Sequence, residues 1–290
     1  RCPEQRRSGW PPRAERLRYD AELIHMLQLS GKNLRHTHLV ATEQVEWQRL
    51  APLVCSVSGW TDRSQLVVLV WNATAELVSQ VTALTPGRVS VISLPSYGNV
   101  HIRWQRYRIY AHFLEANPSV ETILISDALD IAVQHDPFLL VSADDEILVV
   151  DERTHYNMSR DNLFWVCCLY DENVTTPTLA RRVSSSGTAV GRRMAMVHYL
   201  QAMVFEVERL LPMSSAHSWA RLPISLSRGF DQGIHNVLLS SHAMTHTGGL
   251  SGIRVVRITA SLLGHELDVA LRRVDYGYTG LGGSCEHTFT

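Results

Sequence analysis

The sequence predicts an α/β protein in which helices flank a mostly parallel sheet, within a single domain. Apolar segments rich in β-branched residues alternate with segments of helical periodicity, which is the pattern of successive βαβ units. The 290 residues are 45% hydrophobic and 19% charged, a composition that favours a folded protein over a disordered one. No internal repeat or low-complexity segment interrupts the alternation.

The first half of the chain has the more regular alternation. Residues 1–35 are rich in arginine, glutamate and proline, and they are predicted to form a stem or N-terminal tail. Apolar, β-branched runs and helical spacing then predict a Rossmann-like order, with strands at 36–41, 66–71, 89–94 and 120–126 and helices at 47–57, 75–84 and 102–115.

The second half is less regular. A strand predicted at 146–150 and a helix at 161–170 precede a small-residue segment at 183–191, which is predicted to be a tight loop. Beyond this loop the spacing predicts helices at 192–211 and 230–239, a strand at 253–259 and a glycine-rich C-terminal tail.

Composition and missing motifs exclude several classes of protein. A net charge of -1 argues against a nucleic-acid partner, which would favour a basic surface. The G-x-G-x-x-G and G-x-x-x-x-G-K-[ST] fingerprints of dinucleotide and P-loop sites are absent. The five cysteines include no C-x-x-C pair, so we expect no structural zinc, and their disulfide pairing is left open.

The start of the chain and its glycosylation sequons predict a protein of the secretory pathway. No apolar run reaches the roughly 18 residues of a membrane span. Because the chain starts at Arg1, we expect that an upstream signal anchor has been removed. Glycosylation sequons occur at Asn72, Asn157 and Asn173, the last in a predicted exposed loop. We therefore predict a Golgi or ER lumenal glycoprotein, held as a type II membrane protein only by the missing anchor.

Two carboxylates follow the fourth predicted strand. In ETILISDALDIAVQHDPF an apolar strand leads directly into Asp127, and Asp130 follows three residues later. Ligands of open parallel sheets bind beyond the carboxyl ends of the strands, where paired carboxylates suit Mg²⁺ or Mn²⁺. The alternative is structural: Asp127 caps the following turn and Asp130 is solvated.

Two further segments carry small or polar residues. In SSSGTAVG, Gly187 permits a ligand to approach the backbone closely, although an ordinary tight loop explains it equally. In GFDQGIHN, Asp231 and Gln232 begin a helix, where Asp231 is either an N-cap or a site residue. A site role predicts that Asp231→Asn keeps its stability and loses turnover.

The acidic motif, the SG segment and the DQ helix, in this order, resemble the GT-A type of nucleotide-diphospho-sugar glycosyltransferase. RYRIYAHFLEANPSVETILISD is also similar to the helix and strand that precede the acidic motif in these enzymes. The resemblance runs from about residue 36 to 240. It implies a GT-A-like catalytic domain over 36–290, with a nucleotide-binding half at about 36–135 and an acceptor half at about 136–275.

The resemblance also implies a role for each candidate residue. The reaction would move a sugar, by retention or inversion, from a nucleotide-sugar donor to a hydroxyl of a glycan, a glycoprotein or a small acceptor. The residues would divide into metal ligands for Mn²⁺ or Mg²⁺ (Asp127, Asp130), donor-binding residues (Asp127, Arg106, Arg108, Gly187) and catalytic residues (Asp231, Gln232).

Three other functions remain open from the sequence. The same carboxylates would serve a different Mg²⁺-dependent phosphotransfer enzyme, although DALDIA lacks the D-x-D-x-[TV] motif of haloacid-dehalogenase-like phosphatases. The wider spacing of the acidic motif would also fit an inactive glycosyltransferase-like domain that only binds a partner. A purely structural module is the third alternative, but it leaves three polar motifs at strand ends unexplained.

Overall fold

The computed structural model describes residues 13–29, 34–43, 45–57, 64–85, 87–95, 102–129, 131–133, 136–142, 146–210, 229–240, 254–259 and 271–273. Its helices are α1 (Arg13–Leu27), α2 (Trp47–Ser56), α3 (Ala75–Leu84), α4 (Ile102–Ala116), α5 (Arg160–Leu169), α6 (Glu172–Leu179), α7 (Arg193–Leu210) and α10 (Phe230–Ser240), with short 3-10 turns η2 (Pro137–Leu140) and η3 (Tyr156–Met158). Its strands are β1 (His36–Thr42), β2 (Ser64–Trp71), β3 (Val89–Leu94), β4 (Thr122–Ser126), β5 (Ile131–Val133), β6 (Glu146–His155), β7 (Arg182–Arg192), β8 (Arg254–Thr259) and β9 (Leu271–Arg273).

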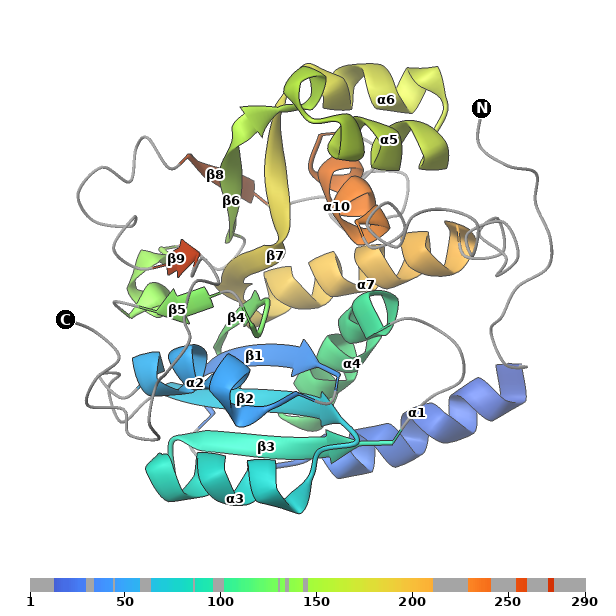
Figure 1. The fold of residues 1–290 in the computed structure, drawn as a ribbon. Coiled ribbons are helices and arrows are strands. Elements are labelled where there is room, and N and C mark those ends of the chain that lie inside the picture. Colours follow the sequence, from blue (N-terminus) through green and yellow to red (C-terminus); the bar gives the residue numbers. More distant parts are fainter. Residues whose placement is uncertain are drawn as a thin grey trace.

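A seven-stranded sheet in the order β3-β2-β1-β4-β7-β6-β8 forms the centre of the molecule (Figure 1). The strands β1 to β4 are mutually parallel, and β6 and β8 are parallel to each other. Only β7 is reversed within this sheet, since it pairs antiparallel with both β4 and β6. The predicted class, an α/β domain with a largely parallel sheet flanked by helices, is confirmed.

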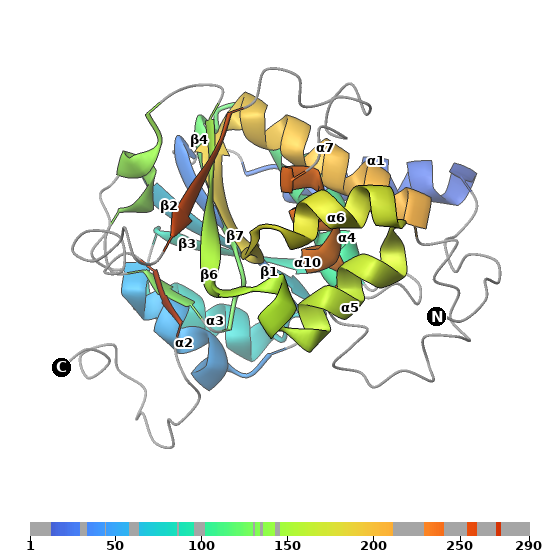
Figure 2. The same cartoon turned by 90° about the horizontal axis from the view of Figure 1, so that it is seen from above.

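Each face of the sheet buries its own apolar layer. Along β2, Val67 and Leu69 join the core cluster that contains α1, α4 and α7, while Val68 and Val70 join the cluster of α2 and α3. Successive side chains of a strand point to opposite faces, so a continuous apolar run is what a strand covered on both sides needs. Figure 2 shows α2 and α3 on one side of the sheet and α1, α4 and α7 on the other.

The segment predicted as a tail contains helix α1. Leu23 and Leu27, four residues apart on this helix, are fully buried in the larger core cluster. Asp20 on α1 forms an ion pair with Arg108 on α4. The charged composition of this segment did not predict the helix, whose buried apolar residues, among the side chains that the structure describes, include Leu23 and Leu27. Helix α1 therefore packs against the rest of the domain, whereas the sequence had predicted a stem or tail.

Two loop predictions are wrong. The small-residue segment lies within β7, because β4 and β6 pair with it on both sides and outweigh its weak strand propensity. The predicted loop around Asn173 is the first turn of α6, which Asp171 caps by accepting a hydrogen bond from the backbone N–H of Val174 at 3.3 Å. Asn173 nevertheless remains exposed.

The late strand at 253–259 is present as β8, and it pairs with β6. The short β9 lies between the predicted strand at 253–259 and the predicted C-terminal tail, where no element was predicted, and it pairs antiparallel with β5. Among the helices of the described residues, none has the length and apolar character needed to cross a membrane.

Candidate functional site

Asp127 stands at the carboxyl end of β4, where the strand order reverses direction. The chain builds β2 and β3 outward on one side of β1, and then places β4 on the other side. Such a switch point opens a crevice between neighbouring strand ends, and open α/β sheets bind ligands there. The backbone N–H of Asp127 donates to the carbonyl of Gly187 on β7 at 2.8 Å. Its side chain is 43% exposed.

A buried histidine helps to fix the backbone of Asp127. The Nε2 atom of His38 on β1 lies 2.5 Å from Ser126 Oγ, and this hydroxyl donates to the carbonyl of Asp127 at 2.9 Å. Burial lowers the pKa of His38 to about 3, so the ring is neutral at physiological pH. A neutral ring with Nε2 protonated donates to Ser126, which completes the chain of hydrogen bonds.

Gly187 makes room for the Asp127 carboxylate. A Cβ atom at position 187 would lie 2.2 Å from Asp127 Oδ2 and 2.7 Å from its Cγ. Any other residue would therefore push the carboxylate out of its present position. Gly187 is not among the residues that line the cavity described below, so its position does not support the predicted direct contact with a donor sugar.

Arg106 on α4 joins two carboxylates from distant parts of the chain. Its Nη1 lies 2.6 Å from Asp127 Oδ1, and its Nη2 lies 2.7 Å from Asp231 Oδ2. Nη2 also donates to the hydroxyl of Tyr107 at 3.0 Å. The Arg106 side chain is only 8% exposed. Burial by itself lowers the pKa of Arg106, but Tyr107, Asp231 and Asp127 outweigh it and raise the pKa well above its ordinary value.

Asp231 lines the cavity described below and is not a helix cap. It lies inside the first turn of α10, and its side chain is 4% exposed. Besides Arg106, it accepts a hydrogen bond from the hydroxyl of Tyr107 at 3.3 Å. Burial raises the pKa of Tyr107 well above its ordinary value, so the phenol remains a neutral donor. Asp231 is therefore held by two donors from α4.

These groups meet in a cavity of about 440 Å³ at this end of the sheet. Its lining comes from α4, the end of β4, β5, β6, α5, β7 and the start of α10: Arg103, Arg106, Asp127, Ile131, Val150, Glu152, Asn162, Trp165, Ser185, Ser186, Thr188, Gly229, Asp231 and Gln232. Two arginines and three carboxylates share this space. The carboxylates outnumber the arginines, which favours a cation or a hydroxyl-rich ligand near them.

Gln232 lines the same cavity from the start of α10. Its Nε2 donates to Asn162 Oδ1 on α5 at 2.7 Å and to Glu152 Oε1 on β6 at 3.2 Å. The structure thus brings together Asp127, Arg106, Asp231 and Gln232, which the sequence had predicted as site residues. They come from three segments that are far apart in the chain.

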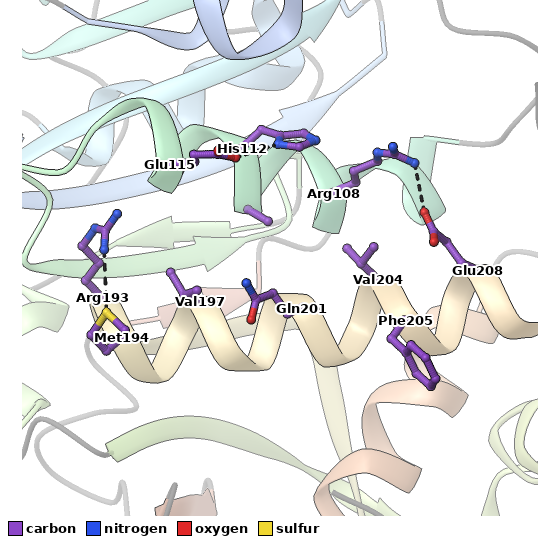
Figure 3. Close-up of a pocket in the computed structure, with 11 residues that line it drawn as sticks. Arg108, His112, Glu115, Arg193, Met194, Val197, Gln201, Val204, Phe205 and Glu208 are labelled. Carbon is purple, nitrogen blue, oxygen red and sulfur yellow. Dashed lines mark hydrogen bonds and ion pairs between the residues drawn. The ribbon is translucent and has the colours of Figure 1, made fainter. Parts of the chain in front are cut away.

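Arg108 is the predicted residue that lies elsewhere. Two residues along an α-helix correspond to a turn of about 200°, so Arg106 and Arg108 face nearly opposite directions. Arg108 pairs with Asp20 on α1 and, at 3.0 Å, with Glu208 on α7. Figure 3 shows it pointing toward Glu208 in a second cavity, of about 570 Å³, between α4 and α7. Its predicted contact with the donor is not supported by this position.

The second cavity is the larger, but its chemistry is less suited to a reaction. Apolar residues of α7, including Val197 and Val204, cover much of it. Arg108 pairs with Glu208 at 3.0 Å, and His112 lies 3.3 Å from Glu115, so several polar groups of this cavity already have partners. We therefore take the cavity beside Asp127 as the candidate site.

The metal prediction rests on Asp127 and Asp130, and Asp130 lies outside the described residues. Within the described ranges, no group of three or more His, Cys, Asp or Glu side chains is arranged to hold a metal ion. Asp127 alone still fits the way that Mg²⁺ and Mn²⁺ bind beside phosphates, because one or two carboxylates suffice when water and substrate oxygens complete the shell. Its half-exposed carboxylate at the cavity mouth meets that requirement.

Sequence reasoning missed several residues of the cavity. Arg103 lies three residues before Arg106, on the same face of α4, and helical spacing from Arg106 would have found it. Glu152 follows Val150, where the predicted strand stopped, whereas β6 continues to His155. Asn162 and Trp165 lie on α5, and no sequence signal indicated that this helix faces a cavity.

Comparisons with protein-family models and with curated proteins gave no significant match for this chain.

Proposed function

We propose that the protein is a metal-dependent glycosyltransferase of the GT-A type, which moves a sugar from a nucleotide-diphosphate donor to a hydroxyl. The single observation that carries the proposal is the convergence of Asp127, Arg106, Asp231 and Gln232 on one cavity at the switch point of a largely parallel sheet. The resemblance named these residues from separate motifs, and their proximity is an independent result.

The proposal assigns Asp127 to the cation and the donor diphosphate. A bound Mn²⁺ or Mg²⁺ would supply neutralisation of the charge that develops on the departing nucleotide. Arg103 is exposed on the same cavity, and it is better placed than Arg108 to pair with the diphosphate. Arg106 is a positioning residue, because its guanidinium is already shared between Asp127 and Asp231.

Asp231 and Gln232 stand on the side of the reacting sugar in this proposal. Asp231 is a fixed negative charge beside the cavity, which would stabilise an oxocarbenium-like centre. Its two donors on α4 disfavour a role as the base that takes the proton of the acceptor. This arrangement favours retention of configuration over inversion.

We further propose that the domain works in the lumen of the secretory pathway. Cys55 on α2 and Cys168 on α5 are both disulfide-bonded. Disulfides persist in oxidising compartments and are rare in the cytosol. The three sequon asparagines, Asn72, Asn157 and Asn173, are all exposed, as glycosylation requires.

The test is calorimetric titration of the protein with UDP and GDP, with Mn²⁺ and with EDTA. One of the two nucleotides should bind in Mn²⁺ and lose most of its affinity in EDTA. Asp127→Asn should weaken binding in Mn²⁺ by about tenfold or more, because it removes an anionic ligand and keeps the shape. Glu76→Gln, at an exposed carboxylate on α3, is the matched control and should bind normally.

Gly187→Ala tests the same site without removing a charge. Its Cβ would displace the Asp127 carboxylate, so binding should weaken to a similar extent. The double variant Asp127→Asn/Gly187→Ala should be no worse than either single variant, since both act on one group. Equal nucleotide affinity in Mn²⁺ and EDTA, or no binding of either nucleotide, would overturn the proposal.

A further inference from the structure

One wall of the candidate cavity is built around a tryptophan. Trp165 on α5 is half-buried and lines the cavity. A Cβ atom at Gly229 would lie 2.1 Å from the indole ring, and one at Gly233 would lie 3.1 Å from the backbone of Trp165. Glycines at both positions let the start of α10 pack directly on this residue. The indole is therefore fixed in place at the cavity wall.

Polar groups held by hydrogen bonds line the same cavity as the indole. Gln232 Nε2 donates to both Asn162 Oδ1 and Glu152 Oε1, at 2.7 Å and 3.2 Å. The amide of Asn162 donates in turn to Ser159 Oγ at 2.8 Å. With its amide nitrogen engaged in this way, Gln232 has its carbonyl oxygen as an acceptor, and Glu152 contributes a carboxylate. The wall thus combines one aromatic ring with several acceptors of hydrogen bonds.

A pyranose ring has the complementary chemistry. One of its faces presents C–H groups, which pack on an aromatic face, and its edge presents hydroxyls, which donate to carboxylate and amide oxygens. The cavity lining holds three carboxylates, Asp127, Glu152 and Asp231, and two arginines, so a negatively charged sugar would be disfavoured there. The wall therefore suits a neutral sugar.

We propose that Trp165, Glu152, Asn162 and Gln232 form a subsite for the ring of a neutral sugar, so that the acceptor hydroxyl belongs to a glycan. As an assignment of the acceptor, this inference rests on the proposed glycosyltransferase function. Binding of a sugar to the wall does not, because it requires neither nucleotide nor metal.

The test is saturation-transfer NMR with the methyl pyranosides of glucose, galactose, mannose and xylose, and with methyl glucuronide as the charged probe. No nucleotide or metal is added. At least one neutral glycoside should give a signal that the glucuronide does not. Trp165→Phe should retain the signal, whereas Trp165→Ala and Glu152→Gln should weaken binding on the order of tenfold.

Trp47→Ala is the matched control, because Trp47 packs on the second core cluster from α2, away from the cavity. It should keep the signal. Circular dichroism shows whether Trp165→Ala folds. If it does not, the test depends on Glu152→Gln only. The inference fails if no neutral glycoside binds, if the glucuronide binds equally well, or if Glu152→Gln and a folded Trp165→Ala bind sugar normally.

Nucleotide titrations of the same variants separate the two proposals. Trp165→Ala should bind UDP or GDP in Mn²⁺ as the unaltered protein does. If it loses the nucleotide and keeps the sugar, the indole stacks on a base and the subsite is wrong. If a neutral sugar binds and neither nucleotide does, the sugar subsite is supported and the proposed glycosyltransferase function is wrong.

Discussion

The guanidinium of Arg106 pairs with two carboxylates, those of Asp127 and Asp231. This arrangement determines how the substitution Asp231→Asn should affect stability. From the sequence, Asp231→Asn was expected to leave stability unchanged. In the structure the Asp231 side chain is 4% exposed and pairs with an arginine that is 8% exposed. Breaking a buried pair typically costs about 3–5 kcal/mol. The remaining bond from Arg106 to Asp127 reduces that loss, so both stability and turnover should fall.

We expect Asp231→Asn to lower the free energy of unfolding by about 2 kcal/mol, measured by urea denaturation. Asp171→Asn is the matched control: it is the same change at the N-cap of α6, where Asn caps as well as Asp. It should be nearly neutral. An Asp231→Asn variant as stable as the control would show that Arg106 does not depend on Asp231 in solution.

The sequence could predict individual residues where a motif fixed their position. Asp127 follows an apolar strand, and a residue just beyond a buried parallel strand lies at the carboxyl edge of the sheet. Arg108 was predicted alongside Arg106 because arginine pairs bidentately with phosphate, but helical geometry points its side chain in nearly the opposite direction. Trp165 could not be predicted, because its place in the cavity depends on how α10 packs on α5 through Gly229 and Gly233.

At the scale of elements, the strands and helices of the first half of the chain were the most predictable. The predicted strand at 89–94 and helix at 75–84 coincide with β3 and α3, since local patterns and tertiary burial agree there. The β7 segment was mistaken for a loop because small residues are weak strand formers. Its strand conformation comes from pairing with β4 and β6, which no local pattern contains.

Helix α1 is held to the domain by a polar contact as well as by Leu23 and Leu27. Asp20 pairs with two groups of α4, Arg108 and His112, the latter at 3.1 Å. Burial by itself raises the pKa of Asp20, but hydrogen bonds from His112 and Arg108 outweigh it and lower the pKa below its ordinary value. Asp20 therefore stabilises the fold in its ionised form, and that contribution declines as the pH falls through its folded pKa.

We expect Asp20→Asn to destabilise the protein by about 1–2 kcal/mol, between the values for exposed and buried pairs. Hydrogen exchange in residues 20–27 should accelerate more than exchange in β1 or β2, because the lost contact holds only α1. Glu22→Gln, at an exposed position on the same helix, should change neither quantity. Uniform acceleration across the sheet would contradict a local role for Asp20.

At the scale of the whole molecule, the redox state of the cysteines reports the compartment in which the domain folds. Cys55 lies on α2 and Cys168 on α5, and both are disulfide-bonded. Cys167, the neighbour of Cys168, is a free and exposed thiol. Partial burial raises the pKa of the Cys167 thiol, so labelling of the folded protein would be slow. The distinction is therefore best measured on unfolded chains.

Protein from its native source, alkylated with iodoacetamide in denaturant without reductant, should carry the label on Cys167 and not on Cys55 or Cys168. After reduction, both should become labelled. Loss of a disulfide typically costs about 2–5 kcal/mol, so the reduced protein should also melt at a lower temperature. Peptide mass spectrometry gives the label at each cysteine, and the adjacent Cys167 is an internal control for the reaction. Alkylation of Cys55 and Cys168 before reduction would exclude an oxidising compartment and remove the lumenal part of the proposed function, leaving the candidate cavity unaffected.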